Sequence, residues 1–178
     1  MSNYRRYFLK NFPVFITMVS NHGQKLFVKN IKILRKAFRN AKSYYDFKII
    51  AITVMQDHVH LILEMSTPED LPKIIRLIKI YFSTNISEQI NDKYISESMK
   101  RRGEKGIWQR RYYDHIIRNE DDLWTHIDYI HFNSMKHYNI SPKNWQYSSF
   151  HKFVKNDYYD INWCNFGDKN NIENLNLE

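Results

Sequence analysis

Residues 47–65 read FKIIAITVMQDHVHLILEM, and this stretch decides how the chain folds. Two apolar runs, 47–55 and 57–65, are separated by so little chain that they predict an antiparallel hairpin. Side chains alternate between the two faces of a strand, so His58 and His60 point one way and the apolar residues between and after them point the other. The hairpin therefore predicts two imidazoles side by side on a central or nearly central strand.

Two neighbouring imidazoles on a strand suit a metal ion, because neutral imidazole nitrogen is the commonest metal ligand in proteins and a strand holds both rings rigidly. The alternative is that His58 and His60 lie on the solvent-facing side of the strand and bind nothing. The pair alone leaves both interpretations open.

Composition limits the class of protein. The 178 residues contain 13 Tyr, 11 Phe and 4 Trp, enough for a packed core, and the net charge of +8 favours a polyanionic partner such as nucleic acid. The single Cys164 excludes an intramolecular disulfide, and we expect an intracellular protein without a membrane span or signal peptide. We expect one domain over residues 1–166 and a flexible tail over 167–178.

Hydrophobic periodicity and capping signals predict the other elements. They are a strand at 13–20, a helix capped by Asn30, a helix capped by Thr67, a basic loop at 91–106, a strand at 111–118 and a helix at 119–137 opening on Asn119 or Glu120. The first six elements, in the order β-α-β-β-α-β, predict an α+β, ferredoxin-like fold with an antiparallel sheet and two helices packed on one face.

Tyr129 and Asn133 lie four residues apart on the predicted helix at 119–137, so their side chains share a face. Asn133 would add an oxygen ligand to the two histidines, and Tyr129 could act as a nucleophile, although a phenol with a pKa of about 10 needs activation at neutral pH. The alternatives are that Tyr129 is a packing residue and that Asn133 caps the helix end.

Longer motifs carry a family resemblance. Besides 55–65, they are 3–8 (NYRRYF), 108–119 (WQRRYYDHIIRN), 128–137 (DYIHFNSMKH), 145–150 (WQYSSF) and 159–163 (YDINW). These motifs, in their order along the chain, resemble those of the REP-associated tyrosine transposases. That group belongs to the single-strand insertion-sequence transposases, which have a His-hydrophobic-His motif and one catalytic tyrosine. The matches span nearly the whole chain.

The resemblance implies a role for each residue of the composite site. His58, His60 and Asn133 would hold Mg²⁺ or Mn²⁺, and Tyr129 would attack a DNA phosphate. The products would be a 5′-phosphotyrosine and a free 3′-hydroxyl, and a second 3′-hydroxyl would reseal the strand. The implied substrate is single-stranded DNA with imperfect hairpins. The implied location is the bacterial cytoplasm, in association with the nucleoid. The wider group uses dimers in which the tyrosine helix serves the partner, whereas the subgroup suggests a self-contained monomer.

Further residues are secondary candidates. His115 could approach the scissile phosphate, or be a core or surface histidine, and His126, one turn before Tyr129, could polarise the phenol or be solvated. The candidate DNA-binding residues are Arg5, Arg6, Lys100, Arg101, Arg102, Lys105, Arg110 and Arg111. The resemblance supports DNA contact for the first two, and the alternative for all of them is a solvated basic surface.

The chain departs from the family pattern at three positions. The family commonly has Pro at the positions of Gln56 and Ser134 and Gly at that of Tyr138. We expect Gln56 to loosen the turn before the histidine strand, and the other two to change where the last helix ends, which makes Asn133 the least secure ligand. Two rival functions remain open: a catalytically silent hairpin-binding protein of the same fold, and a metal-dependent hydrolase of another substrate.

Overall fold

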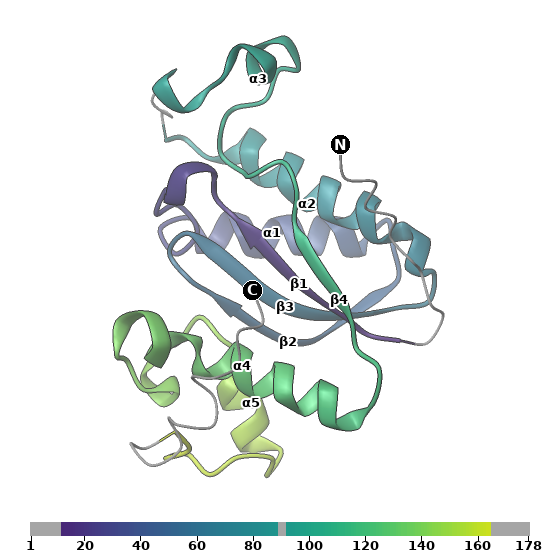
Figure 1. Cartoon of the computed structure of the whole chain (residues 1–178), viewed down its shortest axis with the longest axis vertical. Coiled ribbons are helices and arrows are strands. Elements are labelled where there is room, and N and C mark those ends of the chain that lie inside the picture. Colours follow the sequence, from purple (N-terminus) through teal and green to yellow (C-terminus); the bar gives the residue numbers. More distant parts are fainter. Residues whose placement is uncertain (1–11, 89–91, 165–178) are drawn as a thin grey trace.

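A four-stranded antiparallel sheet forms the centre of the protein (Figure 1). The computed structural model describes residues 12–88 and 92–164, so Arg5, Arg6 and the predicted tail at 167–178 lie outside the described residues. The strands are β1 (Val14–Val19), β2 (Phe47–Val54), β3 (His58–Met65) and β4 (Tyr113–Ile116), in the spatial order β2-β3-β1-β4. This is the ferredoxin-like order, and it confirms that the histidine strand β3 is central.

Helices cover both faces of the sheet. On one face lie α1 (Ile31–Lys42) and α2 (Leu71–Asn85), which pack against each other and against the sheet. On the other face lies α4 (Glu120–Tyr138), and α5 (Phe150–Lys155) packs against it (Figure 1). A short helix, α3 (Glu97–Arg101), lies within the long connection from α2 to β4.

The alternation of side chains on the central strands produces two cores. Val59, Leu61 and Leu63 of β3 join the larger core beneath α1 and α2, while Ile62 of β3 and Phe15 of β1 join a smaller core beneath α4. Burial on both faces is the reason that these strands are almost continuously apolar. The predicted orientation of the histidine strand is therefore confirmed.

Side-chain hydrogen bonds cap only some of the helix N-termini that the sequence predicted to be capped. Asn119 caps α4, since its Oδ1 accepts a 2.8 Å hydrogen bond from the amide of Asp122. Asn30 and Thr67 stand at the predicted positions, before α1 and before the turn that leads to α2, but neither side chain makes a cap bond: the side-chain amide of Asn30 instead donates to the carbonyl of Leu26. Pro68–Asp70 form a 3-10 turn before α2 begins.

Two short helices were not predicted. α3 lies inside the predicted basic loop, and α5 lies beyond the last predicted element. With 5 and 6 residues, each is too short to show the helical period in its sequence.

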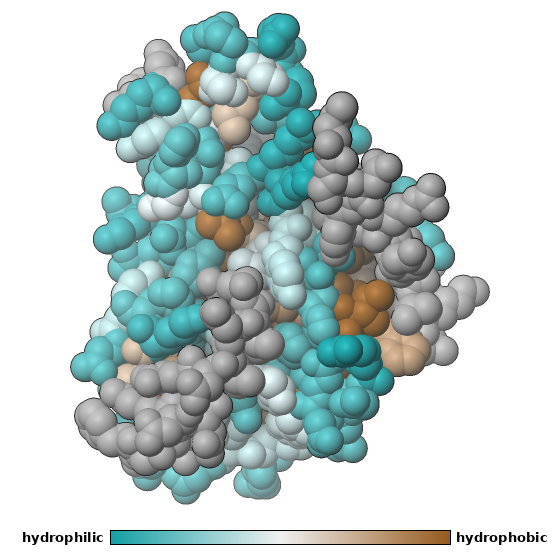
Figure 2. All heavy atoms as spheres, in the orientation of Figure 1, coloured by the Kyte–Doolittle hydropathy of each residue, from teal (hydrophilic) through white to brown (hydrophobic). Residues whose placement is uncertain are grey.

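The face of the molecule drawn in Figure 2 is mostly hydrophilic, with apolar residues in small separate patches. Among the described residues, no helix combines the length and apolar character needed to cross a bilayer.

We expect Asn119→Ala to lower the free energy of unfolding by about 1 kcal/mol, because the substitution removes the side-chain bond that caps α4. Thr67→Ala is the matched control and should change it by less than about 0.5 kcal/mol, since Thr67 makes no cap bond. Urea unfolding of the two variants measures the difference. Equal losses would show that the α4 cap contributes nothing.

A second prediction concerns His131, which lies in α4 at the contact with α5 and whose Nε2 is 2.8 Å from Ser149 Oγ. Burial lowers the pKa of His131 to about 3. The imidazole therefore stays neutral in the folded chain at pH values where it is protonated in the unfolded chain, whose histidine has a pKa near 6.5. This contribution to stability is complete above pH 6.5 and is lost as the pH falls toward 3.

Between pH 7 and pH 5 the wild type should therefore lose about 2 kcal/mol more than His131→Gln, as measured by urea unfolding at both values. The glutamine variant corrects for the other titrating groups. If both proteins lose the same amount, His131 is not held neutral by burial.

Candidate active site

The two histidines of β3 project toward α4 from the middle of the sheet. His60 is fully buried, and its Nδ1 lies 2.8 Å from Oγ1 of Thr17 on β1. The Nδ1 of His58 lies 2.8 Å from Oδ1 of Asp57, and the two imidazole centroids are 4.8 Å apart. Because a neighbour holds Nδ1 of each ring, Nε2 is the nitrogen that each ring would offer to a metal.

α4 brings Tyr129 against this pair within one chain. The rings of Tyr129 and His60 are 5.3 Å apart and nearly perpendicular at 71°. Further along the helix, the ring of His137 lies 4.8 Å from that of His58. Asn133 stands on α4 between these two contact points, about one helical turn from each.

Polar atoms in this region are buried without a partner. Among the described residues, neither Nε2 of His58 nor Oδ1 of Asn133 has a hydrogen-bond partner, although Asn133 donates through Nδ2 to the carbonyl of Tyr129 at 2.7 Å. An unsatisfied buried acceptor costs about 1–3 kcal/mol, and a cation removes that cost. An imidazole nitrogen and an amide oxygen therefore fit a divalent metal, and the sequence-predicted ligand set is compatible with the structure.

Lys136 is a functional candidate that the sequence reasoning missed. Its Nζ lies 3.3 Å from the hydroxyl of Tyr129 and 4.9 Å from the centre of that ring. The signal was available, because residues seven apart lie on the same face of a helix. The hydroxyl of Tyr129 thus has a cationic group beside it.

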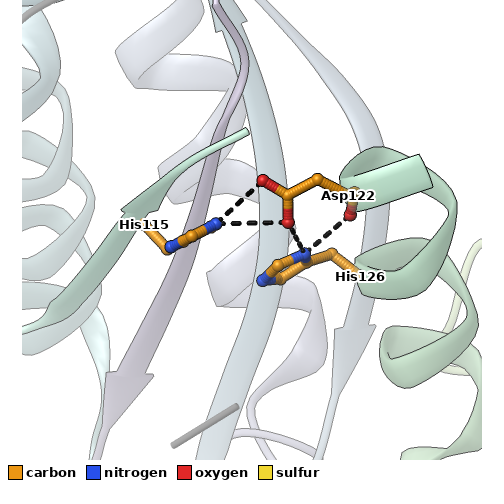
Figure 3. A group of neighbouring side chains, drawn as sticks. All are labelled: His115, Asp122 and His126. Atoms are coloured by element: carbon orange, nitrogen blue, oxygen red, sulfur yellow. Dashed lines mark hydrogen bonds and ion pairs between the residues drawn. The ribbon is translucent and has the colours of Figure 1, made fainter. Parts of the chain in front are cut away.

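The two secondary candidates, His115 and His126, lie next to each other near the N-terminal end of α4, with their rings stacked (Figure 3). Both rings contact Asp122, which the sequence reasoning also missed: His115 Nε2 lies 3.1 Å from Oδ2, and His126 Nδ1 lies 3.1 Å from Oδ1. The ligand atoms of the three residues lie within 4.8 Å of one another, so the group could hold a metal ion. His126 is buried, which rules out the solvated alternative.

Ionisation in this group follows from burial and from its hydrogen bonds. Burial lowers the pKa of His126 and keeps its ring neutral at pH 7. Burial opposes ionisation of Asp122, but the amide of Arg118 and the ring of His115 outweigh it, so the pKa of the carboxyl is lowered. The group thus contains an ionised carboxylate.

The basic residues divide into two sets. Arg102, Lys105 and Arg110 line a groove of about 610 Å³ between α2 and the chain leading to β4, together with Lys79 and Trp108. The remaining described candidates do not line it; they are Lys100, Arg101 and Arg111, all exposed. Lys79 was missed because its place beside this groove depends on tertiary packing.

Comparison with known proteins identifies the class. Residues 9–133 match the family model "Transposase IS200 like". A REP-associated tyrosine transposase of Haemophilus influenzae is 36% identical over 92% of this chain and 93% of its own, and one of Escherichia coli K12 is 32% identical over 92% of each chain. A solved REP-associated tyrosine transposase bound to a REP hairpin has a TM-score of 0.76 and 32% identity, covering 93% of this chain and 92% of that one.

The chain belongs to the IS200-like transposase family. Within that family its relatives are REP-associated tyrosine transposases, as the sequence resemblance predicted. The ferredoxin-like α+β fold is likewise shared with the solved relative.

Proposed function

We propose that this chain is a metal-dependent endonuclease and strand transferase of single-stranded DNA, which cuts beside hairpins through a 5′-phosphotyrosine intermediate. One observation carries the proposal: the ring of Tyr129 lies 5.3 Å from that of His60 in the same chain. The buried, unpartnered Nε2 of His58 and Oδ1 of Asn133 lie on the same two elements. A nucleophile beside a set of metal ligands is the arrangement that phosphoryl transfer requires.

His58, His60 and Asn133 would hold the Mg²⁺ or Mn²⁺ ion, which would neutralise a phosphate and orient it for in-line attack. Other side chains of the chain would orient the ligands and assist the nucleophile. Thr17 and Asp57 fix the two imidazole rings, and Lys136 stabilises the phenolate of Tyr129.

The proposed reaction needs no nucleotide cofactor. Tyr129 loses its proton, its oxygen bonds to the phosphorus, and the bond from phosphorus to the 3′ oxygen breaks. That oxygen leaves as a 3′-hydroxyl after taking up a proton. In strand transfer another 3′-hydroxyl loses its proton and attacks the phosphotyrosine, and the tyrosine leaves and is reprotonated. Each step exchanges one phosphoester bond for another.

Access to the nucleophile must change during the reaction. The side chain of Tyr129 is fully buried, so a phosphate reaches its hydroxyl only after a covering group moves. The side chain of Lys136, itself exposed, lies over the ring and is one such group. Its long flexible stem lets it move from the phenol to an arriving phosphate.

The solved relative was bound to a REP hairpin, and we propose that this chain also takes hairpin-bearing DNA. The basic groove beside α2 supports the proposal, because Arg102, Lys105 and Arg110 line it together with the partly buried ring of Tyr112. Cations that bind the backbone and rings that stack on bases are typical of single-strand binding. Arg5 and Arg6 complete the proposed DNA contacts.

We further propose that residues 1–166 form one catalytic domain, active as a monomer on the bacterial nucleoid. The contact between Tyr129 and His60 within one chain supports the monomer, since no partner is needed to bring the tyrosine to the histidines. A homodimer that exchanges α4 is the alternative.

A covalent adduct tests the activity. The full chain, Mn²⁺ and hairpin-flanked single-stranded DNA labelled at its 3′ end should give a protein–DNA band in a denaturing gel. Tyr129→Phe should abolish the band, because the substitution removes the attacking oxygen. Tyr44→Phe, which alters a tyrosine that is 70% exposed, is the matched control and should keep it.

An adduct that persists in Tyr129→Phe would contradict the assignment of the nucleophile. Tight binding of the hairpin without any adduct would favour the catalytically silent protein. Hydrolysis of another substrate that survives Tyr129→Phe would favour the third interpretation.

Lys136→Met should slow adduct formation at pH 7 by about 10- to 100-fold, because a hydrogen bond to a charged group contributes about 1.5–3 kcal/mol. The loss should shrink as the pH rises, since hydroxide then supplies the phenolate that Lys136 stabilised. Lys136→Arg should retain most of the rate, and Lys155→Met is the matched control on the exposed surface of α5.

The readout is the single-turnover rate as a function of pH. If Lys136→Met shows the same pH profile as Lys155→Met, the ammonium group does not act on the phenol.

A further inference from the structure

His115, Asp122 and His126 form a compact group on the α4 side of the sheet, apart from the histidine pair of β3 (Figure 3). His115 comes from the edge strand β4, and the other two come from the first two turns of α4. One carboxylate oxygen, Oδ1 of Asp122, lies 3.2 Å from His115 Nε2 and 3.1 Å from His126 Nδ1. Two imidazole nitrogens and one oxygen thus converge from two consecutive elements, β4 and α4.

We propose that this group is a second metal site, which binds a divalent transition ion of the zinc type. Bonds of about 2.0–2.2 Å at tetrahedral angles place neighbouring ligand atoms about 3.3–3.6 Å apart. The observed separations of 3.1 and 3.2 Å between Oδ1 and the ring nitrogens are a few tenths of an ångström or less below that range. Three protein ligands leave a fourth position for water or a phosphate oxygen.

The ligand chemistry selects the ion. Two imidazoles and one carboxylate favour zinc and similar ions, whereas Mg²⁺ prefers oxygen ligands throughout.

Hydrogen bonding alone is the competing account of the same distances. In that account His115 Nε2 and His126 Nδ1 both donate to Asp122, and the second N–H is shared with the backbone carbonyl of Asp122 at 2.7 Å. Metal binding would require each neutral ring to carry its proton on its other nitrogen, Nδ1 of His115 and Nε2 of His126, so the two rings change tautomer without a net release of protons. The other oxygen, Oδ2, accepts from the amide of Arg118 at 3.0 Å and can keep that bond.

Two of the three side chains in the group are partly exposed. The side chain of His126 is 3% exposed, whereas those of His115 and Asp122 are 24% and 12% exposed. A bound ion would tie β4 to the start of α4, the helix that carries Tyr129. The site would thus support the position of the nucleophile, but metal binding here does not depend on the proposed transposase activity.

Equilibrium dialysis of the purified full chain against Zn²⁺ tests the site. Asp122→Asn should bind one Zn²⁺ fewer per chain than Asp121→Asn, with an affinity at this site reduced more than about tenfold. Asp121→Asn is the matched control, because it removes an exposed carboxylate from the same turn of α4. Co²⁺ should give the intense visible absorption of four-coordinate cobalt in Asp121→Asn but not in Asp122→Asn.

Asp122 also supports the helix start, so His115→Gln on β4 provides a second variant that leaves α4 intact. It should lose the same Zn²⁺ ion while its circular dichroism spectrum matches that of wild type. Equal zinc stoichiometry in Asp122→Asn and Asp121→Asn, or an unchanged stoichiometry in His115→Gln, would overturn the proposal. Neither result depends on whether Tyr129 forms an adduct, so the two proposals fail separately.

Discussion

The strict alternation of β3 is the constraint on which both the core and the candidate active site depend. β3 is paired on both sides, and His60 lies between Thr17 of β1 and Thr53 of β2. Val59 and Leu61 face α1 and α2, so the histidines must face α4. A slip of one residue would put imidazoles into the larger core and apolar chains into the site, and the burial of both faces forbids it.

α4 supplies the other half of the site by running along the row of aromatic rings on that face of the sheet. His126 contacts Phe15 at 4.8 Å, Tyr129 contacts His60, and His137 contacts His58. These residues recur at helical spacing, so one rigid helix fixes all three contacts at once. The start of α4 is held in turn by Asn119, which caps it. Small changes at that end would therefore be transmitted to the nucleophile along the helix.

Sequence reasoning succeeded where one element decides the outcome and failed where two must meet. The period of two placed His58 and His60 on one face, and the spacing of four placed Tyr129 and Asn133 together. Asp122 was missed because its role needs β4 beside α4. Asn119 caps its helix, whereas Asn30, with the same side chain before a helix, is drawn to the carbonyl of Leu26. Local propensity is compatible with an asparagine that caps a helix and with one that bonds elsewhere, and the surrounding structure decides which hydrogen bond forms.

Two departures from the pattern of REP-associated tyrosine transposases prove to be linked. The amide of Gln56 donates a 3.1 Å hydrogen bond to the hydroxyl of Tyr138, so this turn is held rather than loosened. A proline at position 56 would lack the N–H, and a glycine at 138 would lack the hydroxyl. α4 runs on through Tyr138 and ends at Asn139, whose left-handed backbone (φ 53°) closes the helix. The bond joins the end of α4 to the turn before β3, beside the contact of His58 with His137, so it ties the tyrosine helix to the histidine strand.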